Sequence, residues 1–133
     1  MIKREKTDTL AIHCSATPAT MDIGVEKIKE WHVKENGWED VGYHFVITRS
    51  GELQTARSEE YQGAHAPKVN FRSLAVCLIG GTDNNQQWEN NSDINIRLKF
   101  KHFLTLIYIN QNIQIIIKIN ALYLKLIFLY KNL

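Results

Sequence analysis

The stretch SLAVCLIGG (residues 73–81) is an almost unbroken apolar run that ends in two glycines. A short run of this kind, rich in Leu, Val and Ile, is typical of a strand that is buried on both faces. Such a strand belongs to the interior of a sheet whose two faces are covered by helices. We therefore expect residues 73–81 to form the central strand of an α/β fold.

Two upstream segments predict further parts of that fold. The sequence TLAIHC (residues 9–14) alternates Leu10 and Ile12 with smaller or polar side chains, as a strand does. Residues 24–36 instead carry apolar side chains at three- to four-residue spacing, which indicates a helix. Asp22 is the expected N-cap of this helix, and the Asn36-Gly37 pair is its expected end.

A β-hairpin is predicted between this helix and the central strand. The sequence VGYHFVITRSGELQTAR (residues 41–57) contains two alternating segments on either side of Ser50-Gly51, a typical turn pair. The order strand, helix, hairpin, central strand predicts an α/β fold with a mixed central β-sheet flanked by helices.

The length and charge of the chain restrict the kinds of protein to which it can belong. Its 133 residues suit one domain with a substantial core, and 16 basic against 14 acidic residues give no general attraction to nucleic acid. The N-terminal sequence MIKREKTDTL lacks the apolar segment of a signal peptide. Cys14 and Cys77 fit a reduced, cytoplasmic protein in which both are buried free thiols, although the two could also pair.

The composition changes abruptly at residue 94. Six residue types (Ile, Leu, Asn, Lys, Phe and Tyr) fill 34 of the 40 positions from 94 to 133, but only 26 of the first 93. Residues 1–93 carry 10 basic and 14 acidic side chains, whereas the rest of the chain carries six basic and no acidic ones. These six types are also the complete set that codons made only of A and T encode. We therefore expect a domain at residues 1–93 and an aberrant tail at residues 94–133.

The tail has two explanations. A frameshift or a read-through into non-coding DNA near residues 91–97 would give this bias, and so would an Ile- and Leu-rich element from an AT-rich genome. A membrane span is not convincing, because a spanning helix needs about 20 mostly apolar residues and INQNIQIIIKIN (residues 109–120) is interrupted by Asn, Gln and Lys. The isoleucines at 113, 115, 117 and 119 alternate as in a strand.

Three side chains of the first domain are candidates for chemistry. His13 stands where the first strand gives way to a loop, a common place for a functional side chain on a rigid scaffold, and it could be one ligand of a metal. Tyr43 is expected on the same strand face as Phe45 and Ile47, where it could equally be a core tyrosine. His65, in the sequence GAHAP, could line a groove or simply lie in a surface loop.

A series of motifs in this chain resembles one enzyme family. The motifs are HCSAT (13–17), IGVEKIKEWHVKENGWEDVGYHFVITRSGEL (23–53), GAHA (63–66) and NFRSLAVCLIGG (70–81). In this order and spacing they are similar to the phage lysozyme-type N-acetylmuramoyl-L-alanine amidases, which are relatives of the peptidoglycan recognition proteins. The resemblance extends from about residue 10 to residue 81 and is specific because the motifs occur together.

The resemblance implies a zinc-dependent enzyme that hydrolyses the amide bond between N-acetylmuramic acid and L-alanine in peptidoglycan, and so lyses cell walls. It implies that His13 is a zinc ligand, that Tyr43 is a catalytic residue beside the metal, and that His65 binds substrate. Three protein ligands would leave one zinc position for a water molecule, whose pKa the metal lowers. Such an enzyme is expected in the cytoplasm of the host before lysis.

The tail replaces the part of the chain in which the family carries its other zinc ligands. In the family, two further zinc ligands, a His and a Cys, follow the central strand, but here no Cys follows Cys77 and the only later His is His102. We assign His32 a structural role and His102 none. The resemblance therefore implies a fold with an incomplete C-terminal part and an impaired enzyme. Two other functions remain open: a non-catalytic peptidoglycan-binding module, and an inhibitor of a phage RNA polymerase.

Overall fold

The computed structural model describes residues 1–87, 94–110 and 114–117. Within these ranges one mixed sheet has the strand order β3-β2-β4-β1-β5. The strands are β1 (Thr9–Cys14), β2 (Phe45–Ile47), β3 (Leu53–Thr55), β4 (Ser73–Leu78) and β5 (Gln114–Ile117). Only β2 and β3 pair antiparallel, while β4 pairs in parallel with both β1 and β2. The predicted central strand is confirmed, because β4 is the middle strand and is buried along its whole length.

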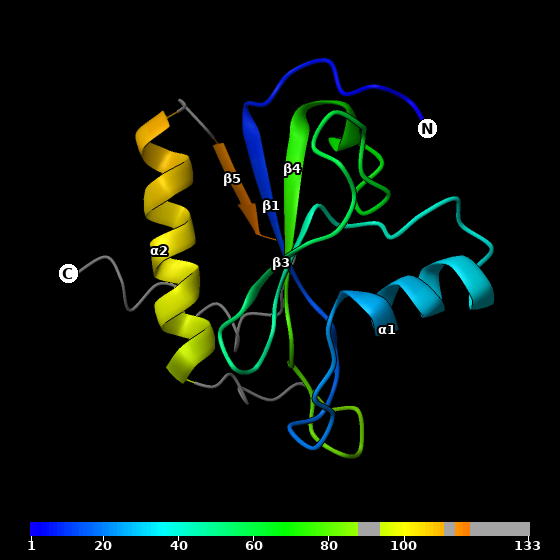
Figure 1. The fold of residues 1–133 in the computed structure, drawn as a ribbon, viewed down its shortest axis with the longest axis vertical. Helices are drawn as coiled ribbons and strands as arrows, with labels where there is room; N and C mark the ends of the chain where they lie inside the picture. The colour runs from blue at the N-terminus through cyan, green and yellow to red at the C-terminus, as the bar shows by residue number, and fades with distance from the viewer. Residues whose placement is uncertain (88–93, 111–113, 118–133) are drawn as a thin grey trace.

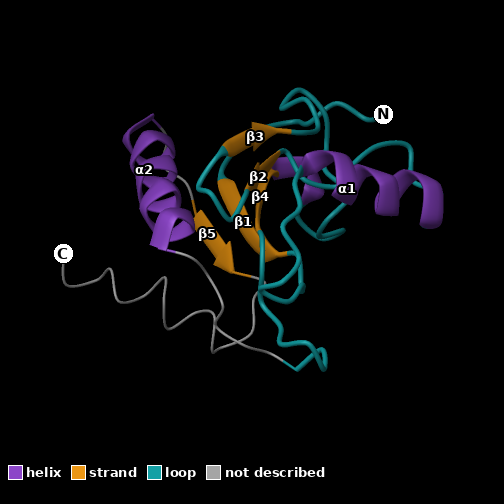
Figure 2. Ribbon diagram, turned by 60° about the horizontal axis from the view of Figure 1, so that its bottom comes forward, coloured by secondary structure: helices purple, strands orange, loops and turns teal. Residues whose placement is uncertain are grey.

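Two helices flank the sheet, which confirms the predicted fold class, although the sequence located only the helix at residues 24–36 and did not predict α2. Helix α1 (Val25–Glu30) continues directly into a π-helical turn (Trp31–Glu35), and α2 (Ile94–Asn110) follows β4 in the chain. Figures 1 and 2 show α1 and α2 on opposite sides of the sheet. The fold is therefore a three-layer α/β arrangement with one described helix on each face.

Alternation along the strands divides the core between these two layers. On the α2 face, strand side chains such as Ile12 and Val76 pack with three helix side chains, Ile96, Phe100 and Phe103. On the α1 face, Ile28 of the helix packs with Val41, Val46, Cys77 and Ile79. Because neighbouring residues of a strand point to opposite faces, the sequence of β1 and β4 supplies both layers at once.

The described part of the tail supplies the helix on one face of the sheet and one edge strand. Residues 94–110 form α2, and its three buried side chains complete the larger of the two core clusters. Residues 114–117 form β5, which confirms the strand predicted from the isoleucine alternation at 115 and 117; positions 113 and 119 lie outside the described residues. The described helices, α2 included, fall short of the length and apolarity that a membrane crossing requires.

One local prediction is wrong. Asp22 does not cap α1; the N-cap position is Gly24, whose residue type offers no capping side chain. The amide of Val25 instead donates to the side-chain oxygen Oε1 of Gln54 on β3, 2.9 Å away. The cap therefore comes from a strand that is distant in sequence, which explains why local signals pointed to the wrong residue.

Candidate functional site

The structure brings the three predicted site residues together at the α1 face of the sheet. His13 lies near the carboxyl end of β1, in register with Cys77 of β4, and its side chain is only 8% exposed. The centroid of its ring is 5.1 Å from that of Tyr43 and 5.0 Å from that of His65. We call His13, Tyr43 and His65 the triad cluster below.

The loop that carries His65 is held close to Tyr43 by backbone contacts. The amide of Ala64 donates to the carbonyl of Gly42, 3.0 Å away. A side chain at position 42 would collide with the carbonyl of Ala64, and one at position 63 would collide with the His65 ring. The side-chain oxygen of Asn70 also accepts from the amides of His65 and Ala66. The glycines of the GYHF and GAHA motifs therefore permit the close approach that forms the triad cluster.

Tyr43 does not lie where the alternation placed it. Strand β2 begins only at Phe45, so Tyr43 precedes the strand and packs with Val46 and Cys77 on the α1 face. Its predicted shared face with Phe45 and Ile47 is therefore wrong. Burial raises the pKa of the Tyr43 phenol far above its usual value, so at neutral pH the hydroxyl is a hydrogen-bond donor rather than a phenolate.

His32 and Trp38 extend the triad cluster toward solvent, which the sequence did not indicate. The ring of His32 lies 5.4 Å from that of Tyr43 and 4.4 Å from that of Trp38, which is 39% exposed. Nδ1 of His32 accepts a hydrogen bond from the amide of Gly42, 2.9 Å away. The structural role assigned to His32 is consistent with this bond. The π-helical turn places it there, and no helical periodicity in the sequence marks such a turn.

A buried polar layer lies beneath the triad cluster. His44 is fully buried; its Nε2 donates to the carbonyl of Tyr61 at 2.9 Å, and its Nδ1 accepts from the amide of Ala75 at 3.0 Å. These two bonds use both nitrogens of a neutral imidazole. Burial, with small contributions from Arg4 and Arg57, lowers the pKa of His44 to about 4.

We expect this histidine to make folding pH-dependent. In the unfolded chain a histidine has a pKa of about 6.5, whereas folded His44 titrates near 4. As the pH falls below about 6.5 the unfolded chain binds a proton that the folded chain rejects, so stability falls by up to about 1.4 kcal/mol per pH unit. Burial also lowers the pKa of His32 and adds a contribution of the same sign.

Urea unfolding at several pH values between 7.5 and 4.5 checks this expectation. The slope of stability against pH should shrink in His44→Gln, and it should persist in the matched variant His102→Gln, because His102 is exposed on α2. A stability that stays constant over this range would contradict the neutral, doubly bonded state of His44.

The described side chains do not make a catalytic zinc site with three protein ligands. No three His, Cys, Asp or Glu side chains of the described ranges lie close enough together to hold a metal ion. Cys14 packs with the α2-face cluster, Cys77 is buried as a free thiol, and His102 is exposed on α2 across the sheet from His13. Outside these ranges the sequence offers only two acidic side chains of ligand type, Glu89 and Asp93. The described residues therefore do not supply the His and the Cys that the resemblance implied as partners of His13 in a three-ligand zinc centre.

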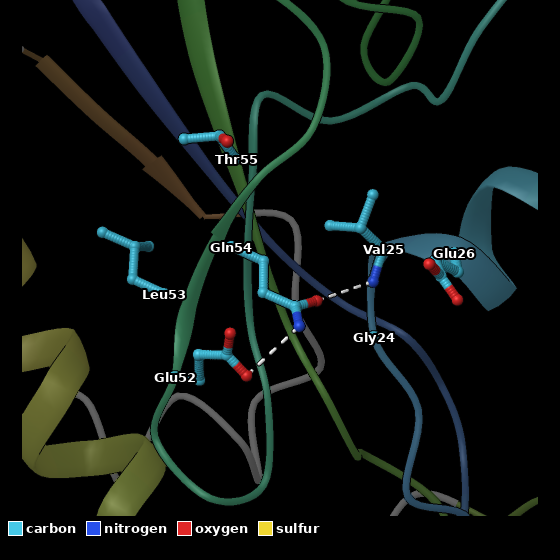
Figure 3. A pocket seen from close by; sticks show the side chains of 7 residues that line it. All are labelled: Gly24, Val25, Glu26, Glu52, Leu53, Gln54 and Thr55. Atoms are coloured by element: carbon cyan, nitrogen blue, oxygen red, sulfur yellow. Dashed lines mark hydrogen bonds between the residues drawn. The ribbon is translucent and has the colours of Figure 1, made fainter.

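A separate cavity of about 530 Å³ lies between the start of α1 and β3. Figure 3 shows the Gln54 side chain bridging it, with hydrogen bonds to the Val25 amide and to Glu52. Its lining residues are Gly24, Val25, Glu26, Glu52, Leu53, Gln54 and Thr55. None of the predicted site residues lines it, so this cavity is distinct from the triad cluster.

The sequence of this chain is similar to those of phage endolysins. It is 51% identical over 81 residues to an endolysin of Klebsiella phage KP32, covering 61% of this chain and 53% of that protein. It is 46% identical over 89 residues to an endolysin of Escherichia phage T7, covering 67% and 58%. The chain thus spans little more than half the length of these relatives.

The fold has solved counterparts as well. The Drosophila peptidoglycan recognition protein SD superposes with a TM-score of 0.76 at 16% sequence identity, covering 94% of this chain and 82% of that one. At this identity the likeness concerns the fold alone. The sequence profile of the N-acetylmuramoyl-L-alanine amidases matches residues 3–98, which is well over half of the chain. The chain therefore belongs to the N-acetylmuramoyl-L-alanine amidase family.

Proposed function

We propose that this chain recognises peptidoglycan through the triad cluster and that its zinc-dependent hydrolysis of the N-acetylmuramoyl-L-alanine amide is impaired. The observation that carries the proposal is the donor set: the cluster is assembled, but among the described residues it brings together two metal-binding side chains, His13 and His65, and not three. Family membership supports peptidoglycan as the ligand, and so do the names of the endolysin and peptidoglycan recognition relatives.

The chemistry that remains is that of binding. The protonated hydroxyl of Tyr43 is a donor for a carbonyl of the ligand, and the partly exposed ring of Trp38, which like Tyr43 packs on His32, offers an apolar surface. Fixing the metal-bound water of an amidase requires more protein ligands than this cluster supplies. Nothing in the described ranges favours a phage RNA polymerase as partner, so peptidoglycan is the ligand that we propose.

Sedimentation with purified Gram-negative sacculi tests the binding. The full chain should co-sediment with sacculi in the presence of EDTA, and Tyr43→Phe should weaken binding by about tenfold or less, the effect of one lost hydrogen bond. The matched variant Tyr61→Phe also removes a phenol hydroxyl but leaves the triad cluster intact, so its binding should be unchanged. A chain that stays in the supernatant would refute the proposed recognition.

Release of soluble muropeptides, measured with added zinc, tests the impairment. We expect none above background from the full chain. Release that is lost on His13→Ala would show that the chain completes a zinc site and would contradict the impairment. Restoring a C-terminal region with a His and a Cys at family spacing should then restore hydrolysis.

A further inference from the structure

Strand β3 lies at one edge of the described sheet and pairs with β2 alone. Backbone hydrogen bonds continue this hairpin beyond both ends of β3. The amide of Thr48 donates to the carbonyl of Glu52, 3.0 Å away, and the amide of Ala56 donates to the carbonyl of His44, 2.8 Å away. Hydrogen-bonded pairs of the hairpin therefore lie two residues before and two residues after Gln54.

The outer side of β3 has backbone groups that the hairpin does not use. Because hydrogen-bonded pairs recur at every second position of an antiparallel ladder, Gln54 turns its N–H and C=O toward Val46 of β2. Leu53 and Thr55 turn theirs away from β2, and no described residue bonds to them there. Another extended segment can pair with such an edge through its own backbone.

The cavity beside β3 indicates which side chain such a segment would carry. Glu52 and Gln54 are two residues apart, so they share a face of the hairpin, and both line this cavity together with Glu26 of α1. Figure 3 shows the two carboxylates on either side of the Gln54 amide. Neither carboxylate takes part in an ion pair of the described residues. A segment paired with β3 would point alternate side chains toward this face, where a lysine or arginine would meet both carboxylates.

A second copy of this chain fits the edge less well. Two copies related by a two-fold axis would pair β3 with its own counterpart. That arrangement would bring two sets of Glu26 and Glu52 to one interface, where like charges repel. Residues 1–93 also carry 14 acidic against 10 basic side chains. The charge therefore favours a basic partner over a second copy.

We propose that the outer edge of β3 docks an extended, basic segment of another protein. Backbone hydrogen bonds to Leu53 and Thr55 would hold the segment, and one lysine or arginine would lie between Glu26 and Glu52. Because β3 has 3 residues, the contact is small and belongs to the transient class of interfaces. No residue of the triad cluster lines this cavity, so the docking does not depend on recognition of peptidoglycan.

NMR titration of the nitrogen-15-labelled full chain with a short synthetic peptide tests the docking. The peptide alternates valine and threonine, has one central lysine and is blocked at both ends. The amide signals of Leu53 and Thr55 should move to lower field, because these groups gain hydrogen bonds. The amide of Gln54 should change less, because it already faces β2. The same peptide with methylated backbone nitrogens along one edge should bind at least about tenfold more weakly, since it lacks those donors.

Variants of the chain test the two parts of the site separately. Glu26→Gln and Glu52→Gln should each weaken binding of the lysine peptide by about two- to fivefold, the range of an exposed ion pair. The matched control Glu35→Gln removes an exposed carboxylate at the far end of the π-helical turn and should leave the affinity unchanged. Thr55→Pro removes an outward N–H without breaking a bond to β2, and should weaken binding by about tenfold. The methylated peptide tests the same hydrogen bonds if this variant fails to fold.

Several results would overturn the proposal. They are a lysine peptide that does not bind at about 1 mM, equal binding of the methylated peptide, equal binding of a peptide with glutamate in place of lysine, and shifts confined to amides away from β3. Sedimentation of the full chain at increasing concentration tests the second copy. A dimer that Thr55→Pro abolishes would show that this edge pairs with itself, and would overturn the basic partner.

Discussion

Arg57→Ala should lower the free energy of unfolding by roughly 3–5 kcal/mol. The guanidinium of Arg57 is buried and donates to the carbonyls of Val41 and Gln62, each 2.7 Å away, and to that of Asp40 at 3.3 Å. Alanine would leave these acceptors without their donor, and unsatisfied buried groups cost about 1–3 kcal/mol each. Urea denaturation at pH 7.5 measures the loss.

Two further variants make this result specific. Arg57→Lys keeps the charge but loses the planar fork of donors, so it should lie between the wild type and the alanine variant. Lys34→Ala removes one positive charge from an exposed position and should change stability by less than about 0.5 kcal/mol. Equal effects of Arg57→Ala and Lys34→Ala would show that the buried donor network does not stabilise the fold.

Phe103→Ala in α2 should cost about 3–5 kcal/mol, the usual range for a large buried aromatic side chain. Phe103 is 3% exposed, and its ring packs edge-to-face on Phe45 of β2, with the ring centroids 5.3 Å apart. The substitution would open a cavity between α2 and the sheet. Thermal and urea unfolding of the purified full chain measure the cost.

The matched control is Leu106→Ala on the same helix. Leu106 is 51% exposed, so its truncation should change stability by less than about 0.5 kcal/mol. Equal, small effects of both substitutions would contradict the packing of α2 against the sheet. A loss of stability in Phe103→Ala but not in Leu106→Ala would show that α2, the first part of the tail, belongs to the hydrophobic core.

A separate origin of the tail is compatible with that packing. A helix covers a sheet when apolar side chains recur at the right spacing, and residues 96, 100 and 103 do so within a segment in which six residue types fill 34 of 40 positions. We propose that residues 1–93 are the family domain and that residues 94–133 arose by a frameshift or read-through. The nucleotide sequence downstream of codon 90 separates the two origins: another reading frame that encodes a His and a nearby Cys would show a frameshift, and the absence of such a frame would refute the frameshift.

The strands could be predicted from the sequence because the hydrophobic pattern of each strand's own residues indicates which of its faces are buried. The alternation in residues 9–14 and the apolar run at 73–81 gave β1 and the central position of β4, and Ser50-Gly51 gave the hairpin between β2 and β3. In each case the pattern is local, so the sequence alone was sufficient.

The sequence-based predictions were wrong where the local structure depends on a residue that is distant in the sequence. The cap of α1 comes from Gln54, and the face of Tyr43 follows from a strand that begins two residues later than its alternation suggested. The approach of His13 to His65 depends on two glycines in separate loops and on Ser73 beneath them. Motif order predicted that these side chains share a site, but not which nitrogens face each other.

The position of β1 in the sheet has a consequence for synthesis. β1 is the first strand to be made, but its partners are β4, at Ser73–Leu78, and β5, at Gln114–Ile117. The hairpin of β2 and β3 can form from neighbouring residues. β1 cannot pair until β4 has been synthesised, after more than half of the chain. Sheets whose central pairings join distant segments fold slowly. Until its partners are synthesised, β1 has unpaired backbone N–H and C=O groups that can pair with strands of other chains. We therefore expect the yield of native protein to depend on the rate of translation and on chaperones more than on the stability of the finished fold.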